Sequence, residues 1–451
     1  MPIQITCFKA YDARGQIPGQ LNADIAYRIG NATAEFLKAE KVVIGRDIRF
    51  SSPEMADAIA RGLMQGGADV IDVGVGGTEL VYFATEALGA HGGIMITASH
   101  NPADYNGMKF VREESKPISA DTGLADIRRL AEKDERYEPR EWGTRSEHDI
   151  WPAYVEKLLS YVDVSALKPY RVVVNAGNGG AGPVIDALEP HLPFEFIKVH
   201  HQPDGTFPNG VPNPLLPENR DVTIDAIREH GADFAIAWDG DYDRCFLFDE
   251  NGGFIEGYYI VGLLAISMLA KQPGEKIVHD PRLTWNTMAM VEEAGGIPIQ
   301  SKSGHAFMKE TMRREDAIYG GEMSAHHFFR DFAFSDSGMI PWLLVAEIMS
   351  RQGKPLSALV AERIAAYPAS GEINREIPDT QAAFAAVRER YEPRALSVDE
   401  TDGIGFEFEN WRFNLRASNT EPVVRLNVES RGDEALMQRK TAEILERLDG
   451  L

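Results

Sequence analysis

Three aspartates stand at alternate positions, 239, 241 and 243, in the stretch WDGDYDR. A tight turn with this spacing aims its carboxylates at one hard divalent cation, and carboxylates this close repel one another unless a cation binds them. The spacing also fits an EF-hand loop, but Arg244 stands where that loop needs glycine, and the flanking runs are typical of strands. The stretch therefore predicts a Mg²⁺ site that works beside a phosphate oxygen, with Arg244 as an adjacent positive charge.

A second stretch, TASHNPADYNGMK (97–109), begins where the apolar run GGIMI ends. A buried strand that ends there delivers Ser99 to a loop, where its hydroxyl reaches solvent or substrate. The flanking residues Thr97 and Asn101 exclude the GxSxG elbow of serine hydrolases. A serine that takes up a phosphoryl group beside a charge-neutralising metal uses this stretch and the aspartates together, and we interpret Ser99 in that way.

Two more residues of the same stretch are candidates for proton transfer. Lys109 follows a turn predicted at Asn106 and Gly107 and is placed to reach back over the site, although a lone lysine is more often part of a solvated surface. Neighbours on an extended segment point apart, so we expect His100 to point away from Ser99 and to shape the loop. Proton transfer is then left to Lys109 or to a histidine from another domain.

Two further polar clusters leave their roles open. The stretch GGEMSAHH (320–327) has no recognised metal-ligand spacing, so it is either a capped turn or a polyol-binding loop. The stretch RASNTEP (416–422) is either an ordinary turn or a nest whose backbone N–H groups hold a phosphate. Cations in or beside these candidate loops are Lys9, Arg14, Lys109, Arg244, Arg282, Lys309 and Arg416.

The composition limits the class of protein and the partners. The 451 residues carry a formal net charge of −23, which argues against nucleic acid or an anionic membrane as partner. Two cysteines, Cys7 and Cys245, are too few for a disulfide framework. The start of the chain has no apolar signal segment, and its longest apolar run, residues 258–270, is too short to span a bilayer. We expect a soluble, cytoplasmic protein.

One pattern of runs occurs three times, with helices expected between the runs. The first runs are KVVIG (41–45), RVVV (171–174) and EKIV (275–278). The second runs are ADVIDVG (68–74), FEFIKV (194–199) and GIPIQ (296–300). The third runs, GGIMI (92–96), ADFAIAW (232–238) and AIYG (317–320), each end in a polar cluster. Such strands predict parallel or mixed sheets covered on both faces, with ligands beyond their carboxyl ends.

The helix after the first run and the C-terminal tail complete the predicted fold. Ser51 and Glu54 have capping-box spacing for that helix, which ends at Gly66 and Gly67. The tail carries the short runs GIGFEF, WRFNLRA and VVRLNVE and a closing amphipathic helix, which predicts a smaller α+β domain. Breaks in composition place the predicted domains at residues 1–144, 145–253, 254–367 and 368–451.

Together and in this order, the motifs resemble the α-D-phosphohexomutase superfamily, specifically its bacterial phosphomannomutases of GDP-mannose synthesis. The resemblance runs over the motifs FKAYDARG (8–15), TASHNPADYNGMK, DGDYDR, KSGHAFMK (302–309), GEMSAHH and RASNTEP. It implies three similar mixed-sheet α/β domains and a smaller C-terminal α+β domain around a central cleft. Three positions depart from the common pattern, namely Ala13, Trp238 and Arg282, where many relatives carry Ile, Phe and Lys, and we do not use them to choose a sugar.

The resemblance also implies a role for each site residue. Ser99 is the phosphorylated serine and, with Asp239, Asp241 and Asp243, a ligand of Mg²⁺. The expected catalytic residues beside Ser99 are Lys109, Arg14 and His326. The residues expected to contact the substrate are Lys9, Tyr11, Arg282, His305, Lys309, Glu322, Ser324, Arg416, Ser418, Asn419 and Thr420. Within this set Glu322 and Ser324 hold sugar hydroxyls, and residues 416–420 hold the phosphate that does not react.

The implied reaction is the reversible conversion of mannose 6-phosphate and mannose 1-phosphate. Phosphoserine 99 donates its phosphoryl group, the hexose 1,6-bisphosphate turns over, and the other phosphate returns to Ser99, so the bisphosphate is also an activator. Glucose phosphates are alternative substrates, and the protein is expected to be a monomer or a homodimer. A phosphoglucosamine mutase is a rival, against which Met323 argues. Further rivals are a metal-dependent sugar phosphatase and a non-catalytic calcium- or sugar-binding protein.

Overall fold

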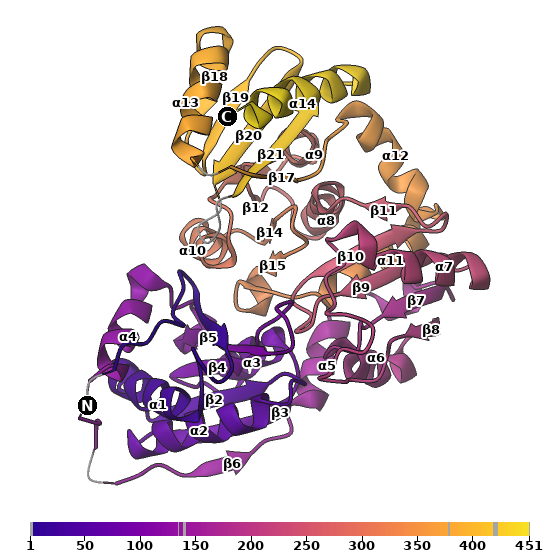
Figure 1. The fold of residues 1–451 in the computed structure, drawn as a ribbon. Helices are drawn as coiled ribbons and strands as arrows, with labels where there is room; N and C mark the ends of the chain where they lie inside the picture. The colour runs from indigo at the N-terminus through magenta and orange to yellow at the C-terminus, as the bar shows by residue number, and fades with distance from the viewer. Residues whose placement is uncertain (1–2, 134, 139–140, 378, 418–422, 451) are drawn as a thin grey trace. The chain divides into compact units, whose positions relative to one another are not determined.

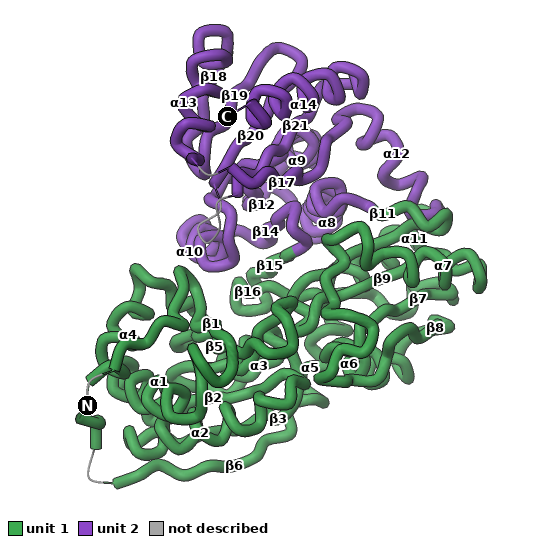
Figure 2. The backbone as a smooth tube through the Cα atoms, viewed as in Figure 1, with its two compact units in different colours: residues 1–254, 326–353 green, residues 255–325, 354–451 purple. Residues whose placement is uncertain are grey.

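The structure, a computed structural model, describes residues 3–133, 135–138, 141–377, 379–417 and 423–450. It divides into two compact units, which Figure 2 draws in different colours. Unit 1 comprises residues 1–254 and 326–353, and unit 2 comprises residues 255–325 and 354–451. Each unit is described by itself. No helix in the described ranges is both long and apolar enough to cross a membrane.

The first sheet of unit 1 has six strands in the order β1-β5-β4-β2-β3-β6. The strands are β1 (Asp12–Gln16), β2 (Lys41–Arg46), β3 (Asp69–Val75), β4 (Gly92–Ile96), β5 (Tyr105–Arg112) and β6 (Arg145–Glu147). The helices are α1 (Ala23–Leu37), α2 (Ser52–Gln65), α3 (Thr78–Ala87) and α4 (Leu124–Ala131). Figure 1 shows α1 and α2 side by side, and their buried residues form one core with those of α4 and the strands.

The second sheet of unit 1 has the order β11-β10-β9-β7-β8. Its strands are β7 (Arg171–Asn175), β8 (Glu195–Val199), β9 (Phe234–Trp238), β10 (Cys245–Asp249) and β11 (Phe254–Ile255). The helices here are α5 (Trp151–Leu159), α6 (Ala181–Leu188) and α7 (Asp221–His230). Unit 1 also contains the antiparallel pair β15 (His327–Phe329) and β16 (Ser335–Asp336), followed by the buried helix α11 (Ile340–Gln352).

Unit 2 begins with a parallel group in which β12 lies between β13 and β14. Its elements are α8 (Gly257–Lys271), β12 (Lys276–His279), α9 (Trp285–Glu293), β13 (Ile297–Gln300), α10 (His305–Glu315), β14 (Tyr319–Gly321) and α12 (Leu356–Ala366). The rest is an antiparallel sheet of order β17-β21-β20-β19-β18. Its elements are β17 (Ile373–Glu376), α13 (Thr380–Tyr391), β18 (Ser397–Asp399), β19 (Ile404–Glu407), β20 (Trp411–Ala417), β21 (Val423–Ser430) and α14 (Glu434–Asp449).

The threefold repeat and the α+β tail are both confirmed. In each copy the strand from the first run lies between parallel strands from the second and third runs: β2 between β3 and β4, β7 between β8 and β9, and β12 between β13 and β14. Strands that follow the polar clusters of the first two copies run antiparallel, so these sheets are mixed. The clusters therefore lie beyond the carboxyl ends of parallel strands, the position at which open α/β sheets bind ligands.

Two local predictions are wrong. Asn106 and Gly107 do not form a turn, because they lie within β5, where Gly107 pairs with Arg14 of β1. This glycine serves close approach instead, since a Cβ built on it would lie 2.3 Å from the Ala13 carbonyl oxygen. Ser51 makes no capping hydrogen bond to α2, because its backbone is itself helical and its hydroxyl accepts a bond from the Asn106 amide.

A buried carboxylate ties three segments of unit 1 together. Glu79 of α3 is fully buried and accepts hydrogen bonds from the Tyr154 hydroxyl at 2.5 Å, the Ser337 hydroxyl at 2.9 Å and the Gly338 N–H at 2.6 Å. Burial raises the pKa of Glu79 to about 8, although these donors oppose the shift. The folded state therefore favours the protonated carboxyl, while the unfolded state loses that proton near the ordinary value of 4.5.

This shift predicts how stability changes with pH. The contribution of Glu79 is complete below its unfolded pKa and is lost as pH rises through the folded pKa, by up to about 1.4 kcal/mol per pH unit. Glu79→Gln removes this titration. We expect the unfolding free energy of the wild type, measured relative to Glu79→Gln, to fall between pH 5 and pH 8, the interval set by a folded pKa of about 8. A constant difference across that interval in denaturant titrations contradicts the prediction.

Candidate active site

Ser99 lies at the carboxyl end of β4 and is almost completely buried. Its φ of 49° lies in the left-handed region, which is unfavourable for a residue with a side chain. The backbone N–H of Ser99 donates to the Thr97 hydroxyl at 2.9 Å, and the Ser99 hydroxyl donates to Asp239 Oδ2 at 2.8 Å. This geometry joins the serine stretch to the aspartate stretch inside unit 1.

The three aspartates follow β9 and are buried together, each offering an oxygen within 4.8 Å of the others. Gly240, between the first two, permits the approach, because a Cβ on it would lie 2.5 Å from the Ser99 carbonyl oxygen. Within the described part of the chain, Asp241 Oδ1 is buried and has no hydrogen-bond partner. An unsatisfied buried acceptor beside two further carboxylates fits a divalent cation, so these residues are suited to hold one.

Lys109 supplies a positive charge to this cluster from the middle of β5. Its Nζ lies 2.7 Å from Asp241 Oδ2 and 2.5 Å from Asp243 Oδ2. Burial opposes the charge, but Asp241 and Asp243 raise the pKa of Lys109, so it stays an ammonium at neutral pH. This favours an electrostatic role for Lys109 over that of a base.

The pKa values of Asp239 and Asp243 are shifted in opposite directions. Burial raises the pKa of Asp239, and the neighbouring charges of Asp243 and Asp241 add to the shift. Burial also opposes the charge of Asp243, but Lys109, His326 and Arg244 hold the pKa of Asp243 well below its usual range. One carboxylate of the cluster is therefore firmly ionised, while the one bonded to Ser99 takes up a proton more readily.

Arginines and a histidine border the cluster in unit 1. Arg14 of β1 donates to the Asn101 side chain at 2.6 Å and to Asp12 at 2.6 Å. Arg244 Nε donates to His326 Nε2 at 3.3 Å and lies 3.7 Å from Asp239. His326 Nε2 lies 3.5 Å from Asp243, so the predicted histidine from another part of the chain does reach the aspartates. Two other predicted residues, Tyr11 and Lys9, precede β1, where Tyr11 is half-buried and Lys9 exposed.

The expectation for His100 is wrong. Its Nδ1 lies 3.0 Å from the Ser99 hydroxyl, because the left-handed backbone at Ser99 ends the alternation of an extended segment and turns both side chains to one side. Burial lowers the pKa of His100 well below its usual range, and Arg244 and Arg14 add to this, so the imidazole is neutral. A neutral imidazole at this distance can exchange a proton with the serine.

In unit 2 the predicted sugar-binding residues surround Arg282. This nearly inaccessible arginine lies 2.7 Å from Asp280, 3.4 Å from Glu322 and 3.3 Å from the Ser324 hydroxyl. Glu322 also accepts the backbone N–H of Gly304, at 2.7 Å, immediately before α10. Arg282 therefore holds the carboxylate and hydroxyl of the GEMSAHH stretch in place.

The remaining predicted residues of unit 2 that the structure describes lie on helix and strand. His305 is the first residue of α10 and Lys309 is fully buried in that helix, while Arg416 lies near the end of β20. Of the cations expected in or beside candidate loops, Arg14 and Lys109 lie within strands and Lys309 lies within a helix, whereas Arg416 lies beside its stretch at the end of β20. Ser418, Asn419 and Thr420 lie outside the described residues.

Two residues of these sites were missed by the sequence analysis. Glu372 lies 3.4 Å from Arg282, 3.0 Å from Arg416 and 3.4 Å from Arg425, and these arginines lower its pKa against the effect of burial. Arg49 binds the backbone of the serine loop. A signal for Arg49 was present, because Asp-x-Arg follows the first strand both at Asp47 to Arg49 and at Asp280 to Arg282.

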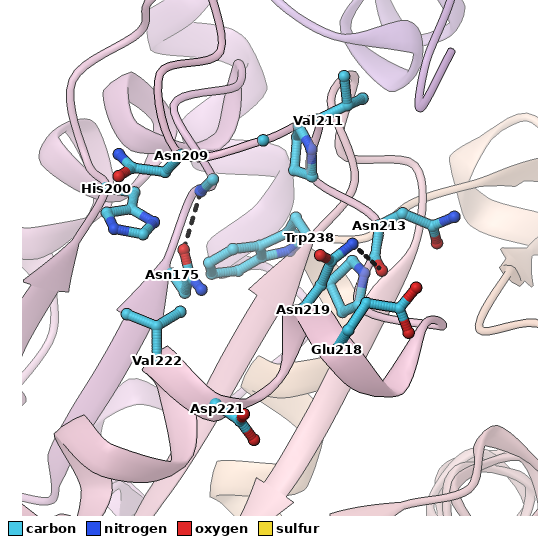
Figure 3. A pocket seen from close by; sticks show the side chains of 14 residues that line it. Asn175, His200, Asn209, Val211, Asn213, Glu218, Asn219, Asp221, Val222 and Trp238 are labelled. Carbon is cyan, nitrogen blue, oxygen red and sulfur yellow. Dashed lines mark hydrogen bonds between the residues drawn. The ribbon is translucent and has the colours of Figure 1, made fainter. Parts of the chain in front are cut away.

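Unit 1 also contains a cavity of about 400 Å³, which Figure 3 shows at close range. It lies beyond the ends of β7 and β9 and is bordered by the segment 209–214 and the start of α7. Asparagines dominate its polar lining, and none of its fourteen described lining residues is a predicted site residue. The cavity therefore shares no residue with the serine and aspartate cluster, although Trp238 directly precedes Asp239.

Comparison with known proteins gives four matches to models of one family, phosphoglucomutase/phosphomannomutase. Its alpha/beta/alpha domains I, II and III match residues 6–138, 152–253 and 256–367, and its C-terminal domain matches residues 372–447. A phosphomannomutase of Escherichia coli is 61% identical over 98% of this chain and 99% of its own length. Phosphohexose mutases of Xanthomonas campestris pv. campestris are 59% identical over 99% of this chain and 100% of their own length.

Solved structures agree with these sequence relatives. The crystal structure of a phosphoglucomutase/phosphomannomutase family protein from Burkholderia thailandensis superposes with a TM-score of 0.89 at 31% identity, covering 100% of this chain and 98% of that one. Because the four family domains match most of the chain in order, and near-full-length relatives share well over half of its residues, the chain belongs to the phosphoglucomutase/phosphomannomutase family.

Proposed function

We propose that this protein is a phosphomannomutase, which interconverts mannose 6-phosphate and mannose 1-phosphate through a phosphoserine at Ser99 and a hexose 1,6-bisphosphate. The observation that carries the proposal is the 2.8 Å contact from the Ser99 hydroxyl to Asp239, within a buried group of three carboxylates. A serine nucleophile beside a cation site is what phosphoryl transfer needs. The names of the relatives at about 60% identity support the same activity.

The residues of unit 1 divide the work at the reacting phosphate. Asp239, Asp241 and Asp243 would hold Mg²⁺, which supplies positive charge to the transferring phosphoryl group when it is bound. The guanidinium groups of Arg14 and Arg244 are partly exposed and lie within the same cluster, so they can donate hydrogen bonds to phosphoryl oxygens. Lys109 keeps the aspartates charged and in place through its two short ion pairs.

Proton transfer falls to histidine in this scheme. Ser99 must lose its proton when it attacks a sugar phosphate, and the neutral His100 Nδ1 at 3.0 Å is positioned to take it. His326 lies beside Arg244 and Asp243, where it can accept the proton of the attacking sugar hydroxyl in the other half-reaction. Lys109 remains an ammonium between two aspartates and is unsuited to act as a base.

Substrate recognition is assigned to unit 2 and to the start of the chain. Glu322 and Ser324 bind sugar hydroxyls that occupy equivalent places in both orientations of the bisphosphate, such as the 3- and 4-hydroxyls. Residues expected to contact the phosphate that does not react, or the rest of the sugar, are Lys9, Tyr11, Arg282, His305, Lys309, Arg416, Ser418, Asn419 and Thr420. The hexose 1,6-bisphosphate also serves as activator, because it phosphorylates Ser99.

A second candidate activity is that of a phosphoglucomutase. Mannose and glucose differ at C2, which lies outside the hydroxyl pair assigned to Glu322 and Ser324, so these two residues distinguish the epimers weakly. Turnover of both sugars on one site follows from that chemistry. A phosphoglucosamine mutase fits less well, because Met323 stands where that group favours Gln.

The four predicted domains remain a proposal, with boundaries at residues 144, 253 and 367. A cytoplasmic location and a monomeric or homodimeric state are likewise predictions from the sequence.

A coupled assay tests the proposed function. Purified protein is incubated with Mg²⁺, a trace of hexose 1,6-bisphosphate and either mannose 1-phosphate or glucose 1-phosphate. We expect the 6-phosphate of mannose to form without inorganic phosphate, and the glucose reaction to measure the second activity. Release of inorganic phosphate in place of the 6-phosphate identifies a phosphatase. Binding of sugar phosphate with no turnover identifies a binding protein.

Glu322→Gln tests the sugar-binding assignment. Replacement of a charged acceptor by a neutral amide weakens its hydrogen bond to a sugar hydroxyl by about 1.5 to 3 kcal/mol, which corresponds to a rise in KM of roughly 10- to 160-fold. Ser324→Ala removes a neutral hydrogen bond to the sugar, worth only about 1 kcal/mol, so a rise of roughly fivefold is expected there. Steady-state kinetics with mannose 1-phosphate compare the two variants. An unchanged KM in Glu322→Gln removes this residue from the sugar site.

A further inference from the structure

Arg49 lies in the loop between β2 and α2 and is almost completely buried. Its guanidinium donates four hydrogen bonds to backbone carbonyls of the serine loop, which we define as residues 97–105. One nitrogen reaches the carbonyls of Ser99 at 2.9 Å and Asn101 at 2.6 Å. The other reaches those of Pro102 at 2.6 Å and Tyr105 at 3.1 Å. None of these four hydrogen bonds involves a side chain of the serine loop, so Arg49 binds the backbone of that loop.

Two groups hold the Arg49 side chain, and a third packs against its backbone. Its Nε lies 3.2 Å from Asp47 Oδ2, and its backbone N–H donates to Asp47 Oδ1 at 3.0 Å. The ring of Phe207 lies over the guanidinium at 5.1 Å. Gly205 packs against the backbone of the loop between β2 and α2, where a Cβ built on this glycine would lie 2.6 Å from the Ile48 carbonyl oxygen. Asp47 orients the arginine and Phe207 covers it, so the guanidinium is pre-organised for the carbonyls.

The same device occurs in unit 2. Asp280 accepts the backbone N–H of Arg282 at 2.9 Å and pairs with its guanidinium at 2.7 Å. That guanidinium reaches Glu322 and Ser324, which follow the third strand of their repeat, as Ser99 follows the third strand of its own. Five residues separate the first strand from the helix in both copies. The repeat therefore uses an Asp-x-Arg turn twice to hold the functional loop after its third strand.

The backbone conformation of Ser99 requires restraint by its surroundings. Its left-handed backbone, with φ at 49°, is a conformation that costs a non-glycine residue about 1 kcal/mol or more and persists only when its surroundings impose it. The Arg49 bond to the Ser99 carbonyl restrains the peptide that follows Ser99, and therefore the ψ angle of this residue. A relaxed loop moves the hydroxyl away from Asp239, and a displacement of about 1 Å is enough to lower turnover by about 100-fold.

We propose that Arg49 is a positioning residue for phosphoryl transfer, which fixes the serine loop so that the Ser99 hydroxyl stays beside the aspartate cluster. This inference rests on the proposed mutase function. It predicts an effect on kcat with little change in KM, because Arg49 is almost completely buried and its guanidinium bonds to the backbone of the loop that carries the nucleophile.

The principal test compares Arg49→Lys with Arg46→Lys in the full-length protein. Lysine keeps the charge, but its single ammonium cannot bond four carbonyls in two directions. Arg46 is a matched control, because it precedes the same loop and pairs with Asp72 at 3.3 Å, an aspartate that Arg145 also holds at 2.5 Å. We expect kcat to fall by about 100-fold in Arg49→Lys. In Arg46→Lys we expect kcat to stay near the wild-type value.

Two further measurements separate positioning from general stability. Hydrogen exchange should become faster at the amides of residues 97–105 in Arg49→Lys, while the rest of unit 1 keeps its protection. Millimolar guanidinium chloride should restore part of the turnover of Arg49→Ala, and the same concentration of ammonium chloride should not. If kcat and exchange are both normal in a folded Arg49→Lys protein, the proposal is wrong.

A third variant covers the case in which both Arg49 variants fail to fold. Phe207→Leu keeps the arginine and removes the ring that covers it, so a smaller fall in kcat with faster exchange at residues 97–105 is expected. Normal values of both in that variant overturn the proposal. If the wild type shows no mutase activity, the proposed function fails, and the exchange measurement then decides by itself whether Arg49 holds the loop.

Discussion

Ser99→Ala is expected to lower mutase turnover by at least about 10⁴-fold, because no other group then accepts the phosphoryl group. The fold should survive, since the change removes only the two hydroxyl contacts of Ser99, to Asp239 and to His100, each worth about 1 kcal/mol. The coupled assay with mannose 1-phosphate measures the first effect, and thermal unfolding measures the second. Intact mass of protein incubated with hexose 1,6-bisphosphate should show a phosphorylated wild type and an unphosphorylated variant.

Ser160→Ala is the matched control for this experiment. Ser160 is exposed at the end of α5 and bonds only to a carbonyl of its own helix, at 2.6 Å, among the interactions described for it. Its loss should change neither turnover nor phosphorylation. Near-normal mutase activity in Ser99→Ala would sink the phosphoserine mechanism, and phosphorylation of that variant at another residue would move the nucleophile elsewhere.

Asp241→Asn should lower turnover by about 10³-fold at saturating Mg²⁺, because the variant loses one of three charged ligands and several kcal/mol of charge stabilisation with it. The free energy of unfolding should stay the same or rise slightly, although activity falls. The three buried carboxylates repel one another, and Lys109 keeps its ion pair with Asp243 at 2.5 Å when Asp241 becomes neutral. Activity falls while the unfolding temperature holds or rises.

The test is a Mg²⁺ titration of turnover for the wild type and Asp241→Asn, with chelator-treated wild type as reference. The wild type should lose activity on chelation and regain it with Mg²⁺, whereas the variant should stay low at every concentration. Asp225→Asn, on the exposed face of α7, is the control for loss of one acidic charge. Full activity of Asp241→Asn at high Mg²⁺ shows that Asp241 is dispensable, and full activity of chelated wild type contradicts the metal requirement.

The polar clusters were predictable because their position in the sequence is also their position in the fold. Apolar runs rich in β-branched residues form the strands, and the polar residues that interrupt them must leave the sheet at its carboxyl edge. The stretches TASHN, DGDYDR and GEMSAHH all follow the third strand of a copy. This local relation between run and cluster is confirmed in all three copies.

Single backbone conformations were not predictable in the same way. The Asn106–Gly107 pair favours a turn by its local chemistry, but pairing of β5 with β1 requires close approach at that glycine and overrides the preference. His100 was expected to point away from Ser99, an expectation that holds only for extended backbone. Ser99 has a left-handed φ, and its carbonyl is bonded by Arg49, fifty positions away in the sequence, a contact that no local pattern reveals.

Side-chain environments were the other limit. Lys109 looked like a solvated lysine or a proton carrier, and only its ion pairs with Asp241 and Asp243, which outweigh its burial, keep it an ammonium. Lys309 has an ionisable side chain, which is typical of a surface position, but it is fully buried in α10. Glu372 stands in no recognised motif, and its joint contact with Arg416 and Arg425 depends on pairing of β20 with β21, which sets these two arginines opposite each other. Such partners are far apart in the sequence, so no local pattern reveals them.

By itself the sequence determined the kinds of element, the threefold repeat, the serine and aspartate stretches and the family, because these follow from residue types at short spacing. Only the tertiary structure decided which polar groups meet. The Ser99 hydroxyl bonds to Asp239, Lys109 forms ion pairs with Asp241 and Asp243, and Arg49 bonds to four backbone carbonyls. The physical reason is that charge, strain and protonation depend on distance and burial in space, and long-range strand pairing sets both.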